Sequence, residues 1–200
     1  MIEAQFPALQ VVLPLFGALL AALVRRSGPA YLITLVVSLI TPVISWGLLY
    51  QVLDNGPISY VFGDWAPEFG IEYRIDIVNA LLLVLVSTVG AVIAPFARRS
   101  VASEIEDDRI AGFYCVYLLS MCGLLGVAIT GDAFNAFVFL EISSLSTYVL
   151  IALGRDRRAL LAAYQYLIMG TIGATFYVIG VGMLYAMTGT LNISLIAERI

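Results

Sequence analysis

The sequence predicts an all-α, polytopic membrane helix bundle with about six transmembrane helices, short loops and a small aromatic-rich, hairpin-like loop at 54–76. Two observations lead to this fold class. The 200 residues are 62% hydrophobic and only 12% charged, with a mean hydropathy of +1.00, which excludes an ordinary water-soluble domain. The charged residues are also clustered, so that long uncharged runs separate them.

Counting between charges predicts the spans in order, because a helix needs about 20 apolar residues to cross about 30 Å of hydrocarbon. Only the fifth run contains a charged residue. Turn residues such as Pro29 and the Asp54–Pro57 segment fall between runs, where helices are expected to end. The six predicted spans are 4–24, 31–53, 77–97, 110–131, 133–154 and about 160–187.

The loop at 54–76 is the one connection long enough to fold by itself. Its aromatic residues lie among turn residues, which is typical of a short hairpin lying on the lipid headgroups. We expect it to anchor and cover the bundle, and we assign it no chemistry. The aromatic residues are Tyr60, Phe62, Trp65, Phe69 and Tyr73.

Arginine counts predict the orientation, since basic residues tend to stay on the cytoplasmic side. Eight of the ten arginines follow the first, third and fifth spans, and the other two are Arg74 and Arg199. This alternation supports an even number of spans and places both chain ends outside the cytoplasm. The eight are Arg25, Arg26, Arg98, Arg99, Arg109, Arg155, Arg157 and Arg158.

Glu141 is the charged residue in the middle of the fifth run. A carboxylate near the centre of a membrane helix costs roughly 3 kcal/mol or more, so it usually faces a bundle interior and is functional. Burial disfavours the ionised form of a carboxyl and a nearby cation favours it, so a carboxyl balanced between the two can load and release a proton. The alternative is that Glu141 only bonds Ser144, a neighbouring helix or a partner chain.

Helical spacing places Ser144 and Tyr148 on the same face as Glu141, three and seven residues further on. Together with Gln165 in the sixth span they form a possible polar path, although Gln165 can equally be a helix contact. The sequence has no Lys or His, and no Arg falls within a span. A cationic partner for Glu141 is therefore absent, mediated by water, or outside these residues.

No cofactor or metal site is expected. Cys115 and Cys122 lie seven residues apart on one predicted helix, which is too far along its axis for a disulfide and does not suit an iron–sulfur cluster. There is no His for haem.

Four segments resemble the antiporter-like subunits shared by respiratory complex I and Mrp-type cation/proton antiporters, most of all the D subunit of the Mrp group and its relatives in membrane-bound hydrogenases. They are 63–76 (GDWAPEFGIEYRID), 130–144 (TGDAFNAFVFLEISS), 163–175 (AYQYLIMGTIGAT) and 187–192 (MTGTLN). The resemblance implies that Glu141 matches the family's fifth-helix glutamate in a proton path, paired with a lysine on the seventh helix. It also implies that Gln165 stands where complex I subunits usually carry a lysine.

Family members have about fourteen spans with two inverted five-helix repeats. The resemblance thus implies an N-terminal fragment that is divided into flanking helices at 1–109 and the start of the proton-antiporter domain at 110–200. The seventh-helix lysine would lie beyond Ile200.

The leading functional hypothesis is a subunit of a multisubunit prokaryotic plasma-membrane complex that translocates protons, in exchange for or alongside Na⁺, through Glu141. Its partners would be other membrane subunits, lipid and the ions themselves, and no nucleic acid. One alternative is the proton-pumping module of a redox complex such as an NADH–quinone oxidoreductase or a hydrogenase. The other is a structural or assembly subunit.

Overall fold

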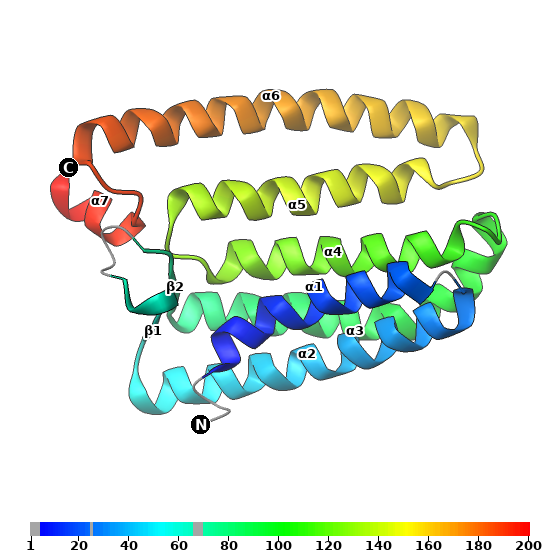
Figure 1. The fold of residues 1–200 in the computed structure, drawn as a ribbon, viewed down its shortest axis with the longest axis horizontal. Coiled ribbons are helices and arrows are strands. Elements are labelled where there is room, and N and C mark those ends of the chain that lie inside the picture. Colours follow the sequence, from blue (N-terminus) through cyan, green and yellow to red (C-terminus); the bar gives the residue numbers. More distant parts are fainter. Residues whose placement is uncertain (1–4, 25, 66–69) are drawn as a thin grey trace.

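The computed structural model describes residues 5–24, 26–65 and 70–200. Within them, six long helices run up and down beside one another, and a hairpin and a short helix lie together at one end (Figure 1). Each long helix is sufficiently long and apolar to cross a membrane, which confirms the polytopic bundle. The six are α1 (Phe6–Val24), α2 (Ser27–Asn55), α3 (Ile77–Glu104), α4 (Ile110–Ile129), α5 (Ala133–Ala152) and α6 (Arg157–Thr188).

Three helices are longer than the apolar runs that predict them. α2, α3 and α6 extend into the polar connections, where side chains can satisfy the free backbone groups of a helix end. The Asp76 carboxylate and the Asn79 backbone N–H form a cap at the start of α3, 2.9 Å apart. At the start of α6, the Asp156 carboxylate accepts the Arg158 N–H at 2.9 Å. Charge spacing therefore locates the spans but not their ends.

The predicted hairpin is present. Strands β1 (Ile58–Val61) and β2 (Glu72–Ile75) pair in antiparallel fashion, with Ile58 opposite Ile75 and Val61 opposite Glu72. Arg25 and residues 66–69, which include the predicted anchor Phe69, lie outside the described residues.

We name the two ends of the bundle by what lies there. The hairpin end holds β1, β2, the α4–α5 turn and a short helix α7 (Ile193–Arg199), with Arg74 and Arg199. The arginine end holds the connections α1–α2, α3–α4 and α5–α6, with the other seven described arginines, which are Arg26, Arg98, Arg99, Arg109, Arg155, Arg157 and Arg158. The alternation of charge along the chain thus corresponds to two ends of one bundle.

Helices α1 to α4 form the main core. Leucines from α2, α3 and α4 are completely buried there: Leu48, Leu83, Leu118 and Leu125. A polar contact runs through the same region, because Gln10 Nε2 donates to Ser45 Oγ at 2.6 Å and Ser45 Oγ lies 2.9 Å from Ser87 Oγ. This hydrogen bonding joins α1, α2 and α3 where water is excluded, so it fixes their relative positions.

Glycines bring α5 against α4. A Cβ atom on Gly123 would lie 2.5 Å from the backbone nitrogen of Ser143, and one on Gly126 would enter the Phe139 ring. Only glycine allows this approach, as expected where membrane helices pack closely.

α6 packs differently from the other helices. Of its 32 residues only Ala163 and Val181 are buried, and it lies along α5 at the edge of the bundle (Figure 1). α7, which follows it, is too short to be recognised as a span and is not predicted from the sequence. Asn192 caps α7 by accepting the Ser194 N–H at 3.0 Å.

Candidate functional site at the middle of helix α5

Glu141 lies at the ninth position of the 20-residue helix α5, so it is close to the middle of the span. Its side chain is half-buried. It is placed away from the α4 contact, which is made by Phe139 and Ser143. Among the described residues, no hydrogen bond or ion pair involves its carboxylate. The candidate carboxylate is thus available to groups on the α6 side.

Two aromatic pairs join α5 to α6 on either side of Glu141. Towards the hairpin end, Phe137 stacks on Tyr177, with ring centroids 6.3 Å apart and planes 13° apart. Towards the arginine end, Tyr148 meets Tyr166 edge to face at 4.9 Å. Because Phe137 and Tyr148 share a helix face with Glu141, the carboxyl lies between these pairs along α5.

Two glycines, Gly170 and Gly173, lie on α6 between the two aromatic pairs. Gly170 lies against the Tyr148 hydroxyl so closely that a Cβ atom there would overlap it. Gly173 has open space where a Cβ would be, with no other atom within 4 Å. The α6 backbone is therefore uncovered near the level of Glu141, where water or a mobile ion could approach.

The other predicted path residues separate into two groups. Ser144 is half-buried and Tyr148 is buried, both on the Glu141 side of α5. Gln165 is exposed and lies on the outer face of α6 with Met169 and Phe176, each 72% exposed. The structure thus brings Ser144 and Tyr148 together with Glu141, and directs Gln165 away from them.

Two buried carboxylates at the hairpin end were missed by sequence reasoning. Glu72 in β2 is 7% exposed, and its oxygens accept from Ser59 Oγ and Asn192 Nδ2, each at 2.6 Å. Asp132 is also 7% exposed, and its Oδ1 caps α5 by accepting the Asn135 N–H at 2.7 Å. The Asp132-to-Asn135 spacing before an apolar run was a recognisable capping signal, whereas nothing local marks Glu72.

Burial changes the acid–base properties of two groups at this end. Desolvation raises the pKa of Asp132 above its ordinary value, although the Asn135 and Phe134 N–H groups oppose this by favouring the ionised form. Desolvation also raises the pKa of Tyr73 to about 12. Tyr73 is therefore neutral at physiological pH, and Asp132 is the group at this end more easily protonated than usual.

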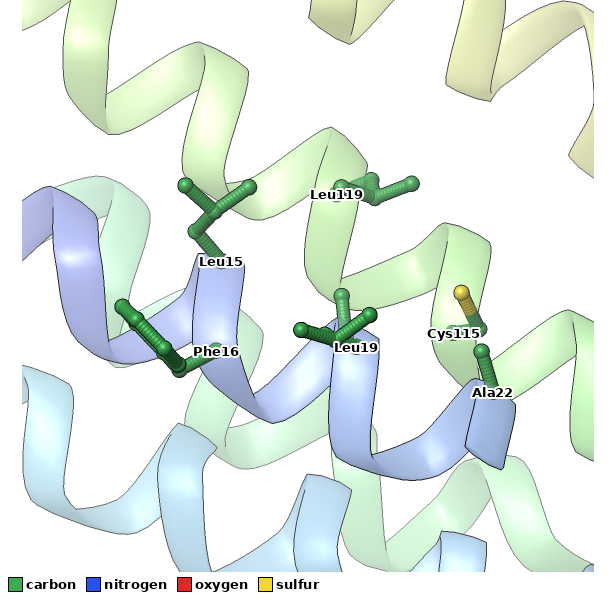
Figure 2. Close-up of a pocket in the computed structure, with 7 residues that line it drawn as sticks. Leu15, Phe16, Leu19, Ala22, Cys115 and Leu119 are labelled. Atoms are coloured by element: carbon green, nitrogen blue, oxygen red, sulfur yellow. The ribbon is translucent and has the colours of Figure 1, made fainter. Parts of the chain in front are cut away.

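The described residues contain no group of three or more acidic, histidine or cysteine side chains placed to hold a metal ion. A groove of about 310 Å³ lies between α1 and α4, lined by apolar side chains and Cys115 (Figure 2). Leu15, Phe16 and Leu19 come from α1, and Leu119 lies beside Cys115 on α4. With one thiol as its polar group, this groove adds nothing to the chemistry of the Glu141 site.

Comparison with protein families identifies residues 130–200 with the transmembrane region described as "NADH:quinone oxidoreductase/Mrp antiporter, TM". That match contains Glu141, both aromatic pairs and the α6–α7 turn.

Curated relatives extend the similarity over nearly the whole chain. NADH-quinone oxidoreductase subunit N of Desulforudis audaxviator is 42% identical over 194 residues, which cover 96% of this chain and 38% of that protein. The Na⁺/H⁺ antiporter D subunit of Alkalihalophilus pseudofirmus is 33% identical over 153 residues, covering 76% of this chain and 30% of that protein. The chain therefore spans well under half the length of these relatives.

Solved structures agree in fold. A chain of the membrane-bound sulfane sulfur reductase, an archaeal respiratory membrane complex, superposes with a TM-score of 0.89 at 31% identity, covering 97% of this chain and 40% of that one. A chain of the Mrp complex from Dietzia sp. DQ12-45-1b superposes with a TM-score of 0.85 at 26% identity, covering 100% of this chain and 39% of that one. The arrangement in Figure 1 thus recurs within both kinds of complex.

Proposed function

Because this chain belongs to the family of antiporter-like membrane subunits shared by NADH:quinone oxidoreductases and Mrp antiporters, we propose that it carries protons through Glu141 within a multisubunit ion-translocating complex. The observation that carries the proposal is the position of Glu141. It is a half-buried carboxylate at the middle of a span, with no partner among the described residues and small residues opposite it on α6. Such a group can bind and release a proton as its surroundings change.

The transported ions are protons and, in exchange, a monovalent cation such as Na⁺. The name of the Alkalihalophilus relative, a Na⁺/H⁺ antiporter subunit, supports this assignment. The partners are other membrane subunits, since the superposed chains come from complexes. Ser144 and Tyr148 extend the polar path from Glu141 towards the arginine end. Gln165 contributes to the contact between α6 and the part of the complex that covers the outer face of this helix.

The test compares Glu141→Gln with Glu141→Asp in the intact protein within its complex. Inverted membrane vesicles carry a pH-sensitive dye, and Na⁺ addition reports exchange. We expect Glu141→Gln to reduce exchange to the background of vesicles without the complex, because an amide cannot carry a proton. Glu141→Asp should keep part of the rate. Glu104→Gln, at an exposed position in the last turn of α3, is the matched control and should transport normally; normal transport by Glu141→Gln would remove this glutamate from the mechanism.

A second candidate is the proton-pumping module of a redox complex. The 42% identity to an NADH-quinone oxidoreductase subunit and the fold shared with a respiratory reductase favour it. In this case an electron donor, rather than Na⁺, would drive proton movement in the vesicles. Glu141→Gln would then leave electron transfer measurable but uncouple it from pumping.

A purely structural role for Glu141 is the competing explanation of any lost activity. Glu141→Ala would then release the neighbouring subunits, which native gels or affinity purification would reveal. Loss of transport from a fully assembled complex contradicts that explanation.

We place the chain in a prokaryotic plasma membrane with the arginine end in the cytoplasm, and both described ends of the chain on the other side. The seven arginines at one end of the bundle support this orientation. Reaction of single cysteines introduced at Ser103 and at Ser59 with an impermeant thiol reagent, in intact cells, tests it. We expect the cysteine at Ser59 to react and the cysteine at Ser103 not to react. The opposite result would reverse the orientation.

A further inference from the structure

The hairpin end is held together by backbone hydrogen bonds among three segments that are distant in sequence. The Gly131 N–H donates to Glu72 O at 2.8 Å, and the Ala133 N–H donates to Leu191 O at 2.9 Å. The Ile193 N–H donates to Gly131 O at 2.9 Å. We call this arrangement of β2, the α4–α5 turn and the α6–α7 turn the clasp. It fixes the first turn of α5 relative to the last turn of α6.

A cavity of about 310 Å³ lies beside the clasp, between the start of α5 and the end of α6. Asp132 and Asn135 supply polar groups to its wall, and Tyr185 comes from α6. Phe134 and Val138 line it further along α5. The cavity therefore has a carboxylate at the end of the bundle and becomes apolar towards the membrane interior.

The apolar part of this cavity points to Glu141 along α5. Phe134 and Val138 lie seven and three residues before Glu141, which places all three on one face of the helix. Val138 is separated from Glu141 by about 4.5 Å along the axis, at 1.5 Å per residue. One helical turn therefore separates the cavity wall from the candidate carboxylate.

Among the described residues that line the cavity, Asp132 is the charged one. No ion pair involves Asp132 among the described residues. Asn192, opposite Asp132 in a backbone bridge, gives its amide to Glu72, a second acid. Arg74 is directed to Ser194 Oγ. A partly enclosed site with an unpaired carboxylate in its wall raises the local concentration of cations and protons.

We propose that this cavity is the path by which protons or small cations reach Glu141 from the hairpin end, with Asp132 as the carboxylate that collects them at its mouth. The proposal rests on the proposed function of Glu141. It adds the end of the bundle from which the ions enter and the route that they take. Asp132 does not replace Glu141 as the carrier, since it lies at the end of the span.

Cysteine accessibility tests the route without depending on transport. In the intact complex with Cys115→Ala and Cys122→Ala, Val138→Cys is exposed to an impermeant, positively charged methanethiosulfonate reagent from either side. We expect reaction from the hairpin side alone, and block of transport afterwards. Leu82→Cys is the matched control, because Leu82 lies at the same depth in α3 and is 44% exposed on its outer face. It should not react from either side.

Asp132→Asn tests the collecting role while keeping a side chain that can cap α5. It should lower the reaction rate of Val138→Cys with the charged reagent, relative to a neutral reagent of similar size, by roughly tenfold at low ionic strength. An unchanged ratio would remove Asp132 from the route. Ile71→Cys, on the hairpin wall of the cavity, provides a second position should Val138→Cys fail to assemble.

The outcomes separate this inference from the function of Glu141. If Phe134→Cys reacts and Val138→Cys does not, the accessible cavity ends before it reaches Glu141, and the inference is overturned. Equal reaction of Leu82→Cys also overturns it. Reaction at Val138→Cys combined with normal transport in Glu141→Gln would leave the cavity in place and reject the proposed carrier.

Discussion

Helices α4 and α6 show two ways of holding a span in the same bundle. Half of the most apolar stretch of α4 is buried inside the chain, compared with 6% of that of α6. α4 contacts α1, α2, α3 and α5, whereas α6 contacts α5 and the short helix α7. The first four helices therefore share one core, and we call them the scaffold. The Glu141 site lies between the scaffold side of α5 and α6, whose outer face is uncovered within the described residues.

The largest effect on stability should follow from changing Gly123 of α4, where α5 packs against the scaffold. In Gly123→Ala the new methyl group would lie 2.5 Å from the backbone nitrogen of Ser143, and a backbone atom cannot move aside as a side chain can. We expect a loss of about 3 kcal/mol in the free energy of unfolding, measured by denaturant titration of the intact protein in mixed micelles. An unaltered unfolding free energy would show that α4 and α5 can separate without penalty.

A smaller loss is expected from the polar contact inside the scaffold. Ser45→Ala removes the acceptor of the Gln10 amide and the neighbour of Ser87. The loss should be about 1 kcal/mol, within the range measured for buried hydrogen bonds between membrane helices. The same titration measures it. Ser103→Ala, whose hydroxyl bonds its own helix at an exposed position, should change little.

The outer face of α6 should tolerate an added methyl group, which the α4–α5 contact does not. A Cβ atom added to Gly182 would have no other atom within 4 Å, and alanine is the better helix former by about 1 kcal/mol. Gly182→Ala should therefore leave the unfolding free energy unchanged or slightly higher. A loss as large as that of Gly123→Ala would mean that another helix lies against this face in the intact protein.

The smallest effect concerns pH at the clasp. Since burial raises the pKa of Asp132 in the folded state, the folded protein binds this proton more tightly than the unfolded chain does. Its contribution to stability is thus full at low pH and is lost as the pH rises from the ordinary aspartate pKa through the raised one. Asp132→Asn should flatten this part of the profile of melting temperature against pH. An identical profile in both proteins would contradict the burial argument.

Spacing between charges was sufficient to locate six spans and Glu141, and aromatic and turn residues were sufficient to locate the hairpin, because each depends on local composition. The clasp could not be found in this way. It joins Glu72, Gly131 and Leu191 through backbone groups, and backbone hydrogen bonds between distant segments leave no side-chain pattern. Burial of Glu72 has the same origin, since its partners Ser59 and Asn192 come from different parts of the chain.

The direction of Gln165 needs the structure in addition to the helical period. Tyr166, Gly170 and Tyr177 have the spacing of one helix face, and that face packs on α5. Gln165 falls beside this face, in register with Met169 and Phe176. Periodicity along α6 therefore separates Gln165 from Glu141 once these contacts show which face packs on α5.

The glycine contact between α4 and α5 has a mechanical consequence. A helix whose backbone interlocks with its neighbour cannot slide or rotate alone, so α5 must move with the scaffold as one rigid piece. Glu141 therefore keeps a fixed position relative to the scaffold. Any cycle that loads and unloads Glu141 must then be driven by groups that move relative to α5. Among the described spans α6 is the least buried, but the clasp holds its last turn to α5, so such movement is confined to the rest of α6.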